Sequence, residues 1–140
     1  MVCISRATFC AVIFLGVLVL VSPLKLSGEE RVIEIIADKD ARYKIPGQRK
    51  PVIVARPGEI LRLRITARRG PAWQKNGLVH RLTFPALKDQ GWDFPLPEGT
   101  HEFTVVVPKK PGKYEGICTV YCGPGHGDMR MKLIVRETSN

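Results

Sequence analysis

The sequence predicts an all-β domain, an antiparallel sandwich or barrel, on the strength of three observations. Apolar and polar residues alternate in short runs, which is the period of a half-buried strand. Proline and glycine separate these runs at close intervals and predict turns, as in Pro57-Gly58, residues 95–99 and Pro111-Gly112. Helical periodicity is hard to find in any segment after the N-terminus. Short strands joined by such turns are typical of a sandwich or barrel.

Seven segments are predicted as strands. The first two, residues 32–37 and 51–55, are short and aliphatic. Residues 60–66 follow, with three aliphatic side chains on one face and two arginines on the other. Residues 70–77 are predicted to form a surface loop before the strand at residues 78–84. The set is completed by residues 103–107, which have an apolar face at alternate positions, and by residues 113–117 and 131–135.

The N-terminal segment is predicted to direct the chain to a membrane. An apolar run extends from position 7 to position 21, and Ser22-Pro23 ends it. Because a spanning helix needs about 20 residues, this run fits a secretory signal better than an anchor. We therefore divide the chain into a signal peptide or short membrane anchor, residues 1–28, and one domain, residues 29–140. Either segment predicts a periplasmic or otherwise extracytoplasmic domain.

The charge of the chain favours an acidic partner. The formal net charge is +9, and removal of residues 1–28, which hold Arg6, Lys25 and no acid, leaves +7. Ten basic and only two acidic residues lie between positions 39 and 69. Such a run is often simply a solvated face, but it also suits an acidic protein or an anionic lipid surface. Nucleic acid is not expected as a partner outside the cytoplasm.

The sharpest chemical signal is the segment Cys118-Thr-Val-Tyr-Cys122-Gly-Pro-Gly-His126-Gly-Asp-Met129. Thiolate, imidazole and thioether groups are the soft and borderline donors that copper prefers. A loop alone rarely closes a metal site. His80, on the predicted strand at residues 78–84, would complete the site and join the loop to the sheet. The sequence therefore predicts a copper site made by this loop and one strand.

Other interpretations of the two cysteines stay open. A disulfide would close a very small loop, would stabilise little, and would leave His126 and Met129 without a role. Zinc accepts cysteine and histidine but has little use for a thioether. A mononuclear blue-copper site needs one cysteine, two histidines and an axial methionine, which leaves Cys118 without a role. A binuclear copper site uses both thiolates as bridges, so the second cysteine favours it.

At these residues the chain resembles the CuA domain family. That family comprises the copper-bearing domain of haem–copper oxidase subunit II and the C-terminal domain of nitrous oxide reductase. The pattern Cys-x3-Cys-x3-His-x2-Met matches in full, and residues 111–118 resemble the family's approach to the first cysteine. Val79-His80 followed by Phe84-Pro85 resembles the upstream histidine segment. The resemblance covers roughly residues 51–137.

The resemblance implies a cupredoxin-like Greek-key β-barrel that holds two copper ions. Only a backbone carbonyl is needed at position 120, so valine is compatible with the site. The implied bridging ligands are Cys118 and Cys122, the nitrogen ligands are His80 and His126, and the weak ligands are Met129 and the carbonyl of Val120.

The resemblance also implies one-electron transfer, because two bridging thiolates let two close coppers share the odd electron. Every ligand position would be filled, so the domain would have no substrate site and would not be an enzyme by itself. It would act free or as a subunit II-like component of a haem–copper respiratory oxidase. Its redox partner would be the oxidase catalytic subunit or an acidic electron donor, with possible membrane association. The small stand-alone architecture suggests an alternative, an extracytoplasmic copper carrier or metallation factor.

Overall fold

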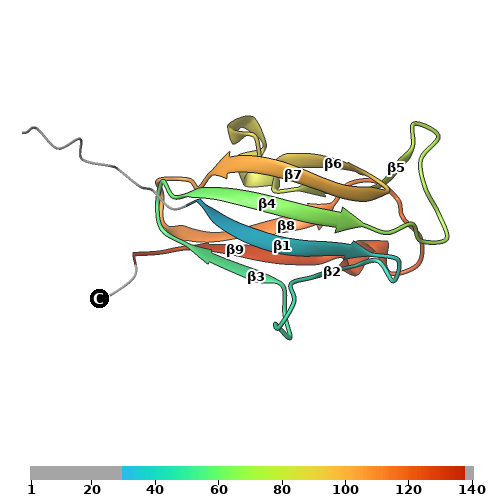
Figure 1. Ribbon diagram of the computed structural model, residues 1–140, viewed down its shortest axis with the longest axis horizontal. Coiled ribbons are helices and arrows are strands. Elements are labelled where there is room, and N and C mark those ends of the chain that lie inside the picture. The colour runs from blue at the N-terminus through green and yellow to red at the C-terminus, as the bar shows by residue number, and fades with distance from the viewer. Residues whose placement is uncertain (1–29, 138–140) are drawn as a thin grey trace, which may run out of the picture.

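Residues 30–137 are described by the computed structural model and form two packed β-sheets (Figure 1). One sheet has the strand order β2-β1-β4-β7, and the other has the order β3-β9-β8-β5-β6. The predicted signal or anchor, residues 1–28, lies outside the described residues. Within residues 30–137, no helix is both long and apolar enough to cross a membrane. The elements are β1 (Arg31–Asp38), β2 (Arg42–Lys44), β3 (Val52–Ala55), β4 (Ile60–Ala67), β5 (Leu78–Thr83), η1 (Pro85–Gln90), β6 (Asp93–Pro97), β7 (Gly99–Val106), β8 (Gly112–Cys118), η2 (His126–Asp128) and β9 (Arg130–Val135).

The all-β fold class is confirmed, and each predicted strand has a counterpart. Two strands were not predicted. β2 is three residues long, and β6 contains Pro95 and Pro97 within a segment that we expected to be a turn. Proline is tolerated in β6 because this strand lies at the edge of its sheet, where a missing N–H leaves no neighbour unpaired. The prediction of a turn over residues 95–99 is therefore wrong for residues 95–97.

The pairing is mixed rather than antiparallel throughout. β1 pairs with β4 in parallel, and β3 pairs with β9 in parallel, while the other pairs are antiparallel. Between β1 and β4 the chain crosses to the other sheet as β3 and then returns, so the two strands run in the same direction. The predicted antiparallel pairing is therefore wrong for these two strand pairs. Alternation of side chains shows which face of a strand is buried, but it does not show the direction of the neighbouring strand.

The core lies between the two sheets and follows the predicted alternation. Leu61, Leu63 and Ile65 on β4 are fully buried, while the arginines between them are partly exposed. An aromatic cluster of Phe84, Trp92, Phe94 and Phe103 links the two sheets, because the ring centroid of Phe94 on β6 lies 5.0 Å from that of Phe103 on β7. Burial of this apolar surface is the main source of stability for the scaffold.

Close contact between β8 and the aromatic cluster fixes the strand that leads to Cys118. A Cβ atom at Gly116 would lie 2.7 Å from the Cζ atom of Phe84, so only glycine allows this approach.

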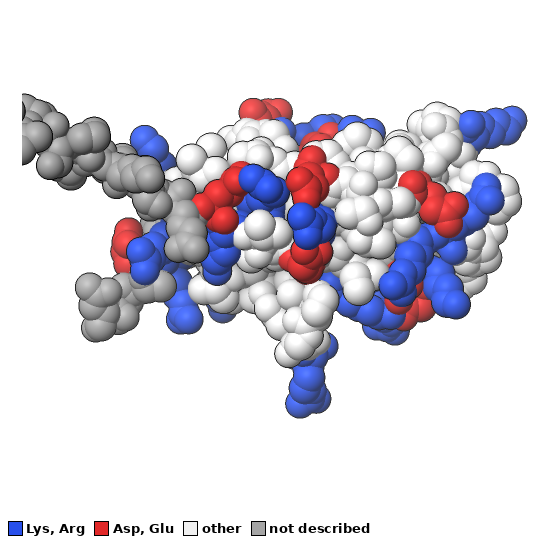
Figure 2. Space-filling view, in the orientation of Figure 1, with Lys and Arg blue, Asp and Glu red and all other residues white. Residues whose placement is uncertain are grey.

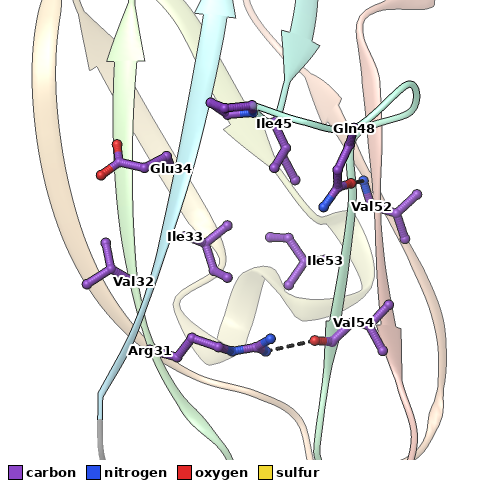
Figure 3. A pocket seen from close by; sticks show the side chains of 10 residues that line it. Arg31, Val32, Ile33, Glu34, Ile45, Gln48, Val52, Ile53 and Val54 are labelled. Carbon is purple, nitrogen blue, oxygen red and sulfur yellow. Dashed lines mark hydrogen bonds between the residues drawn. The ribbon is translucent and has the colours of Figure 1, made fainter.

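A shallow cleft between β1 and β3 is lined by Ile33, Ile45 and Ile53 (Figure 3). The Arg31 guanidinium donates to the carbonyl of Val54 at 2.7 Å and bridges the two sheets there.

Candidate metal centre

The loop between β8 and β9 brings four of the predicted ligand side chains together. Cys118 is the last residue of β8, and Met129 immediately precedes β9. The backbone N–H of Cys118 donates to the carbonyl of Met129 at 3.1 Å and closes the base of the loop. Two antiparallel strands therefore hold the first and last ligand positions at a fixed separation.

The donor atoms of this loop converge on Cys122. Its Sγ atom lies 3.9 Å from the Sγ atom of Cys118, 3.7 Å from Nδ1 of His126 and 3.7 Å from Sδ of Met129. A disulfide needs sulfurs about 2.05 Å apart, so both cysteines are free thiols in this structure. The structure thus disfavours the disulfide interpretation. The carbonyl of Val120 lies 3.2 Å from Sγ of Cys118, so the sixth predicted group also faces the cluster.

His80 approaches the same cluster from β5. The side chain is fully buried, and one ring nitrogen lies within 4.8 Å of both cysteine sulfurs. The pairing of β5 with β6 shifts register between Leu78 and His80, and such an irregularity re-aims a side chain. Here it places both Val79 and His80 inside the molecule. The bulge therefore turns His80 toward the cysteines.

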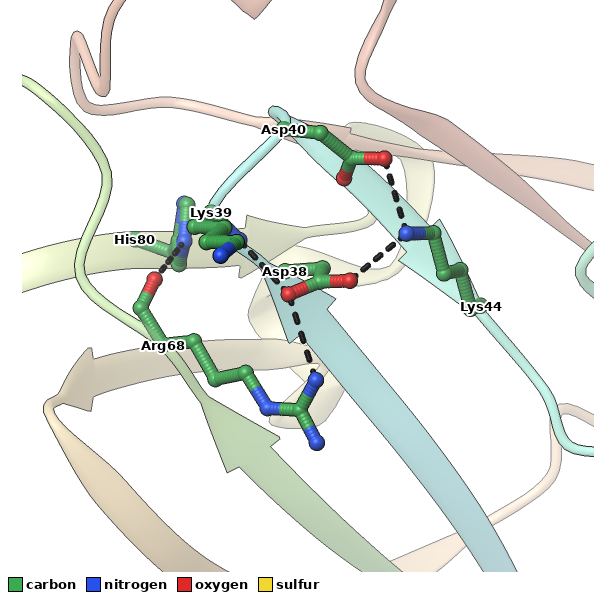
Figure 4. Close-up of polar contacts among 6 residues, drawn as sticks. All are labelled: Asp38, Lys39, Asp40, Lys44, Arg68 and His80. Atoms are coloured by element: carbon green, nitrogen blue, oxygen red, sulfur yellow. Dashed lines mark hydrogen bonds and ion pairs between the residues drawn. The ribbon is translucent and has the colours of Figure 1, made fainter.

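A polar network orients the His80 ring (Figure 4). Its Nε2 atom lies 2.9 Å from the carbonyl of Arg68, whose own backbone N–H donates to the carbonyl of Ala37 at 2.9 Å. The carboxylate of Asp38 contacts the Arg68 guanidinium at 3.5 Å and the Lys44 ammonium at 2.6 Å. The hydrogen bond from Lys44 is the main influence that lowers the pKa of Asp38. Sequence reasoning missed Asp38, because no spacing rule connects it with His80.

The remaining nitrogen of His80 is an unsatisfied buried atom. Nε2 is held by the Arg68 carbonyl, which fixes the hydrogen on that nitrogen and leaves Nδ1 as an acceptor. Nδ1 has no hydrogen-bond partner in the described part of the protein. Metal-ligating histidines typically donate their other ring N–H to a carbonyl in this manner. The geometry of His80 therefore fits a metal ligand.

The two cysteines ionise unequally. Burial raises the pKa of the Cys118 thiol. Contacts with His80, with the backbone at residues 81 and 120 and with Cys122 outweigh burial and lower this pKa to about 6. Burial and the negative charge on Cys118 raise the pKa of the Cys122 thiol. The pair therefore loses one proton easily and holds the second. A bound cation would remove the repulsion that keeps the second thiol protonated, so the charge of the site suits a metal.

The ligand loop, residues 119–129 between β8 and β9, packs against the surface loop at residues 70–77. Gly123 has φ +119°, and a Cβ atom there would lie 2.7 Å from Cγ of Pro71. The Gln74 side chain donates to the carbonyl of Tyr121 at 3.1 Å. Gly70 packs between the carbonyls of Lys39 and Cys122, since a Cβ atom there would lie 3.0 and 3.1 Å from them. The surface loop predicted at residues 70–77 thus braces the ligand loop.

All six residues predicted from the sequence meet at one end of the barrel. Their assignment as ligands stays a prediction, and the structure adds the chemical fit of the donor set. Two thiols, two imidazoles and a thioether are soft and borderline donors of the kind copper binds. Sulfurs 3.9 Å apart are close enough to bind one ion together, because a metal–thiolate bond is about 2.3 Å long.

Comparison with known proteins shows similarity in fold only. The chain matches no family model and no curated protein. It superposes on a chain of a haem–copper terminal oxidase dimer with a TM-score of 0.57 and 19% identity, covering 83% of this chain and 74% of that one.

Two further solved structures are similar over most of their length. The periplasmic domain of cytochrome oxidase subunit II (CoxB) from Bradyrhizobium japonicum gives a TM-score of 0.52 and 17% identity, with 76% of this chain and 84% of that one covered. Auracyanin from Roseiflexus castenholzii gives 0.50 and 21%, with 77% and 98% covered. These likenesses establish that residues 30–137 have the cupredoxin-like fold.

Proposed function

We propose that this chain is a copper-binding electron-transfer protein with a binuclear CuA-type centre. One observation supports the binuclear assignment above the others: both buried sulfurs lie in one cluster with two histidines. A ring nitrogen of His80 lies within 4.8 Å of both sulfurs, and Nδ1 of His126 lies 3.7 Å from the sulfur of Cys122. A mononuclear site would use one cysteine and leave the second buried thiol without a role.

The chain's own residues would hold the copper pair in a rigid cage. Cys118 and Cys122 would bridge the ions, His80 and His126 would each bind one, and Met129 and the Val120 carbonyl would complete the shell. When bound, the copper pair supplies one-electron oxidation and reduction. The ligands come from β5, β8 and the loop that β9 closes, so the sheet resists movement between redox states. Cys118, Cys122 and Met129 are 5%, 1% and 0% exposed, which excludes water and competing ligands.

The exposed end of the site suits exchange of electrons with another protein. His126 is partly exposed, and the ring of Tyr121, 58% exposed, meets it edge-on at a centroid distance of 5.7 Å. Lysine and arginine side chains gather at the end of the molecule where β1 and β4 finish (Figure 2). An acidic redox protein is therefore the partner that this surface favours. Exposed basic residues at this end include Lys39, Arg42, Arg68, Arg69 and Lys75.

The setting we propose is extracytoplasmic, either free or as a subunit II-like component of a haem–copper respiratory oxidase. The signal-like residues 1–28 and the likeness to a periplasmic oxidase domain support it. A copper carrier or metallation factor is less well supported, because a carrier must release its metal. The three sulfur donors here are buried and braced by two loops, which favours retention of copper.

The test of the binuclear site compares Cys118→Ser with the unchanged chain after reconstitution with copper. The unchanged chain should bind two coppers and show intense thiolate-to-copper absorption, and Cys118→Ser should lose the second copper and the mixed-valence colour. His101→Ala is the control, because the His101 ring contacts the Pro97 carbonyl on the exposed surface. Retention of two coppers and full colour by Cys118→Ser would reject the bridge.

The rate of copper release distinguishes an electron-transfer protein from a copper carrier. The loaded chain is mixed with an excess of a strong Cu(I) chelator after reduction. An electron-transfer protein with these buried sulfurs should keep its copper for hours. Complete transfer within minutes would favour the carrier instead.

A further inference from the structure

Two buried polar side-chain atoms in the described residues lack a hydrogen-bond partner. They are Nδ1 of His80 and the hydroxyl of Tyr43. The proposed copper site accounts for His80. Tyr43 is not among the predicted ligands, and its side chain is only 3% exposed. A buried hydroxyl without a partner is destabilising, and buried tyrosines usually find a partner.

The position of Tyr43 explains why its hydroxyl reaches the site. It is the central residue of β2, between the exposed Arg42 and the partly exposed Lys44, so its side chain points inward. Its backbone pairs with Ala37 on β1, next to the Asp38 carboxylate of the His80 network. Burial raises the pKa of the Tyr43 phenol well above its usual range, and the neighbouring Cys118 sulfur raises it further, followed by Cys122. Tyr43 belongs to the same buried cluster as Cys118 and Cys122. The turn before β2 also contacts the loop that holds the cysteines, since a Cβ atom at Gly125 would lie 3.6 Å from Cβ of Ala41. The hydroxyl therefore points into the part of the core that contains the two sulfurs.

We propose that Tyr43 is a positioning residue of the metal centre and donates a hydrogen bond to the Cys118 sulfur when that sulfur is a metal-bound thiolate. A neutral thiol is a weak hydrogen-bond acceptor, whereas a thiolate is a good acceptor for a phenolic O–H. This inference rests on the proposed copper site.

The hydrogen bond has a defined electronic consequence. It draws negative charge from the sulfur and so stabilises the reduced, more electron-rich state of the site. Hydrogen bonds to the cysteine sulfur are among the features that set the reduction potential of copper–thiolate sites. Tyr43 therefore raises the reduction potential and lowers the energy of the sulfur electrons. If the ring served only to fill the core, phenylalanine would serve equally well.

The experiment compares Tyr43→Phe with Tyr114→Phe in the full chain loaded with copper. Tyr114 is the matched control, because it lies on β8 with Cys118 but its hydroxyl donates to the Lys110 carbonyl at 2.7 Å on the surface. Both variants should bind as much copper as the unchanged chain. Tyr43→Phe should lower the reduction potential and move the thiolate-to-copper bands to longer wavelength, and Tyr114→Phe should change neither.

Two further results make the outcome decisive. The metal-free Tyr43→Phe chain should be at least as stable to urea as the unchanged chain, since it loses an unpaired buried hydroxyl. Placing 3-fluorotyrosine at position 43 makes the hydroxyl a stronger donor and should shift the potential upward. If Tyr43→Phe and Tyr114→Phe gave the same potential and bands in a chain that binds two coppers, this inference alone would be overturned. A chain that binds no copper would overturn the proposed function as well.

Discussion

Met129 illustrates how much a single side chain contributes at this site. Its Sδ atom is fully buried and lies 3.7 Å from the Cys122 sulfur. A thioether is a weak ligand that adjusts the potential of a copper site more than its affinity. Met129 is therefore expected to tune the centre, whereas the two cysteines are expected to build it.

Met129→Leu should keep both coppers and change the reduction potential. The substitution conserves volume, so the metal-free chain should lose less than about 1.5 kcal/mol of stability. Copper analysis and voltammetry on the same sample measure the two effects. Loss of a copper from this variant would show that the thioether is a strong ligand, contrary to our assignment.

At the residue scale, the sequence predicted the ligand set but not its supports. Cys118, Cys122, His126 and Met129 lie within one segment, so their spacing was visible. His80 could be found only through the resemblance and a count of donors. Tyr43 and Asp38 reach the site from β1 and β2 through contacts distant in sequence. A tyrosine or aspartate in a short strand has no pattern that marks it as part of a site.

At the scale of elements, the metal centre depends on two loops that lie against each other. The turn at Gly123 has a positive φ and touches Pro71 of the bracing loop. Gly127 in η2 has open space around its Cα atom. These two glycines belong to the same ligand loop, so they provide a matched comparison.

Gly123→Ala should destabilise the metal-free chain by about 1–3 kcal/mol, because alanine is strained at this φ and its Cβ atom meets Pro71. Gly127→Ala should change stability by far less. Urea denaturation of both variants measures the difference. Equal stabilities would mean that the two loops do not constrain each other as described.

A second element-scale feature is the link between β5 and β6 beside His80. The Arg81 guanidinium contacts both carboxylate oxygens of Asp93, at 2.9 and 2.7 Å, and Thr83 donates to the same carboxylate at 2.8 Å. The hydrogen bonds from Arg81 are the main influence that lowers the pKa of Asp93 below its ordinary value of 3.8. The ionised carboxylate therefore helps to hold the strand that carries His80.

The stability that ionised Asp93 gives to the fold depends on pH. Because the pKa of Asp93 is lower in the folded than in the unfolded chain, this stability is complete above its ordinary pKa. It is lost as the pH falls through the pKa of the folded chain. Asp93→Asn should reduce stability at neutral pH and flatten its decline in acid. Asp89→Asn, at an exposed position in η1, is the control. Parallel stability curves for Asp93→Asn and the unchanged chain would contradict this account.

At the scale of the whole molecule, charge is expected to select the redox partner. The sequence alone gave the all-β class and the positive charge, because alternation and composition are local properties. It did not give the two parallel strand pairs, since strand direction depends on how the chain crosses between sheets. It also did not reveal that the surface loop at residues 70–77 packs against the loop that carries the cysteines, a contact visible only in the folded chain.

The loaded, reduced protein should be oxidised faster by hexacyanoferrate(III), an anion, than its driving force alone predicts. The rate should fall as salt shortens the Debye length from about 30 Å at 0.01 M to about 8 Å at 0.15 M. Lys75→Glu should weaken this dependence. Lys109→Glu, next to the start of β8 and remote from Cys118 at its end, should alter it less. A rate that rises with salt would exclude steering by this basic surface.

Electron paramagnetic resonance of the oxidised chain, combined with copper analysis, tests the binuclear site most directly. An unpaired electron shared equally between two copper nuclei gives a seven-line hyperfine pattern, and one confined to a single nucleus gives four lines. We expect two coppers per chain and seven lines. One copper per chain with a four-line spectrum would contradict the account and leave the second cysteine unexplained.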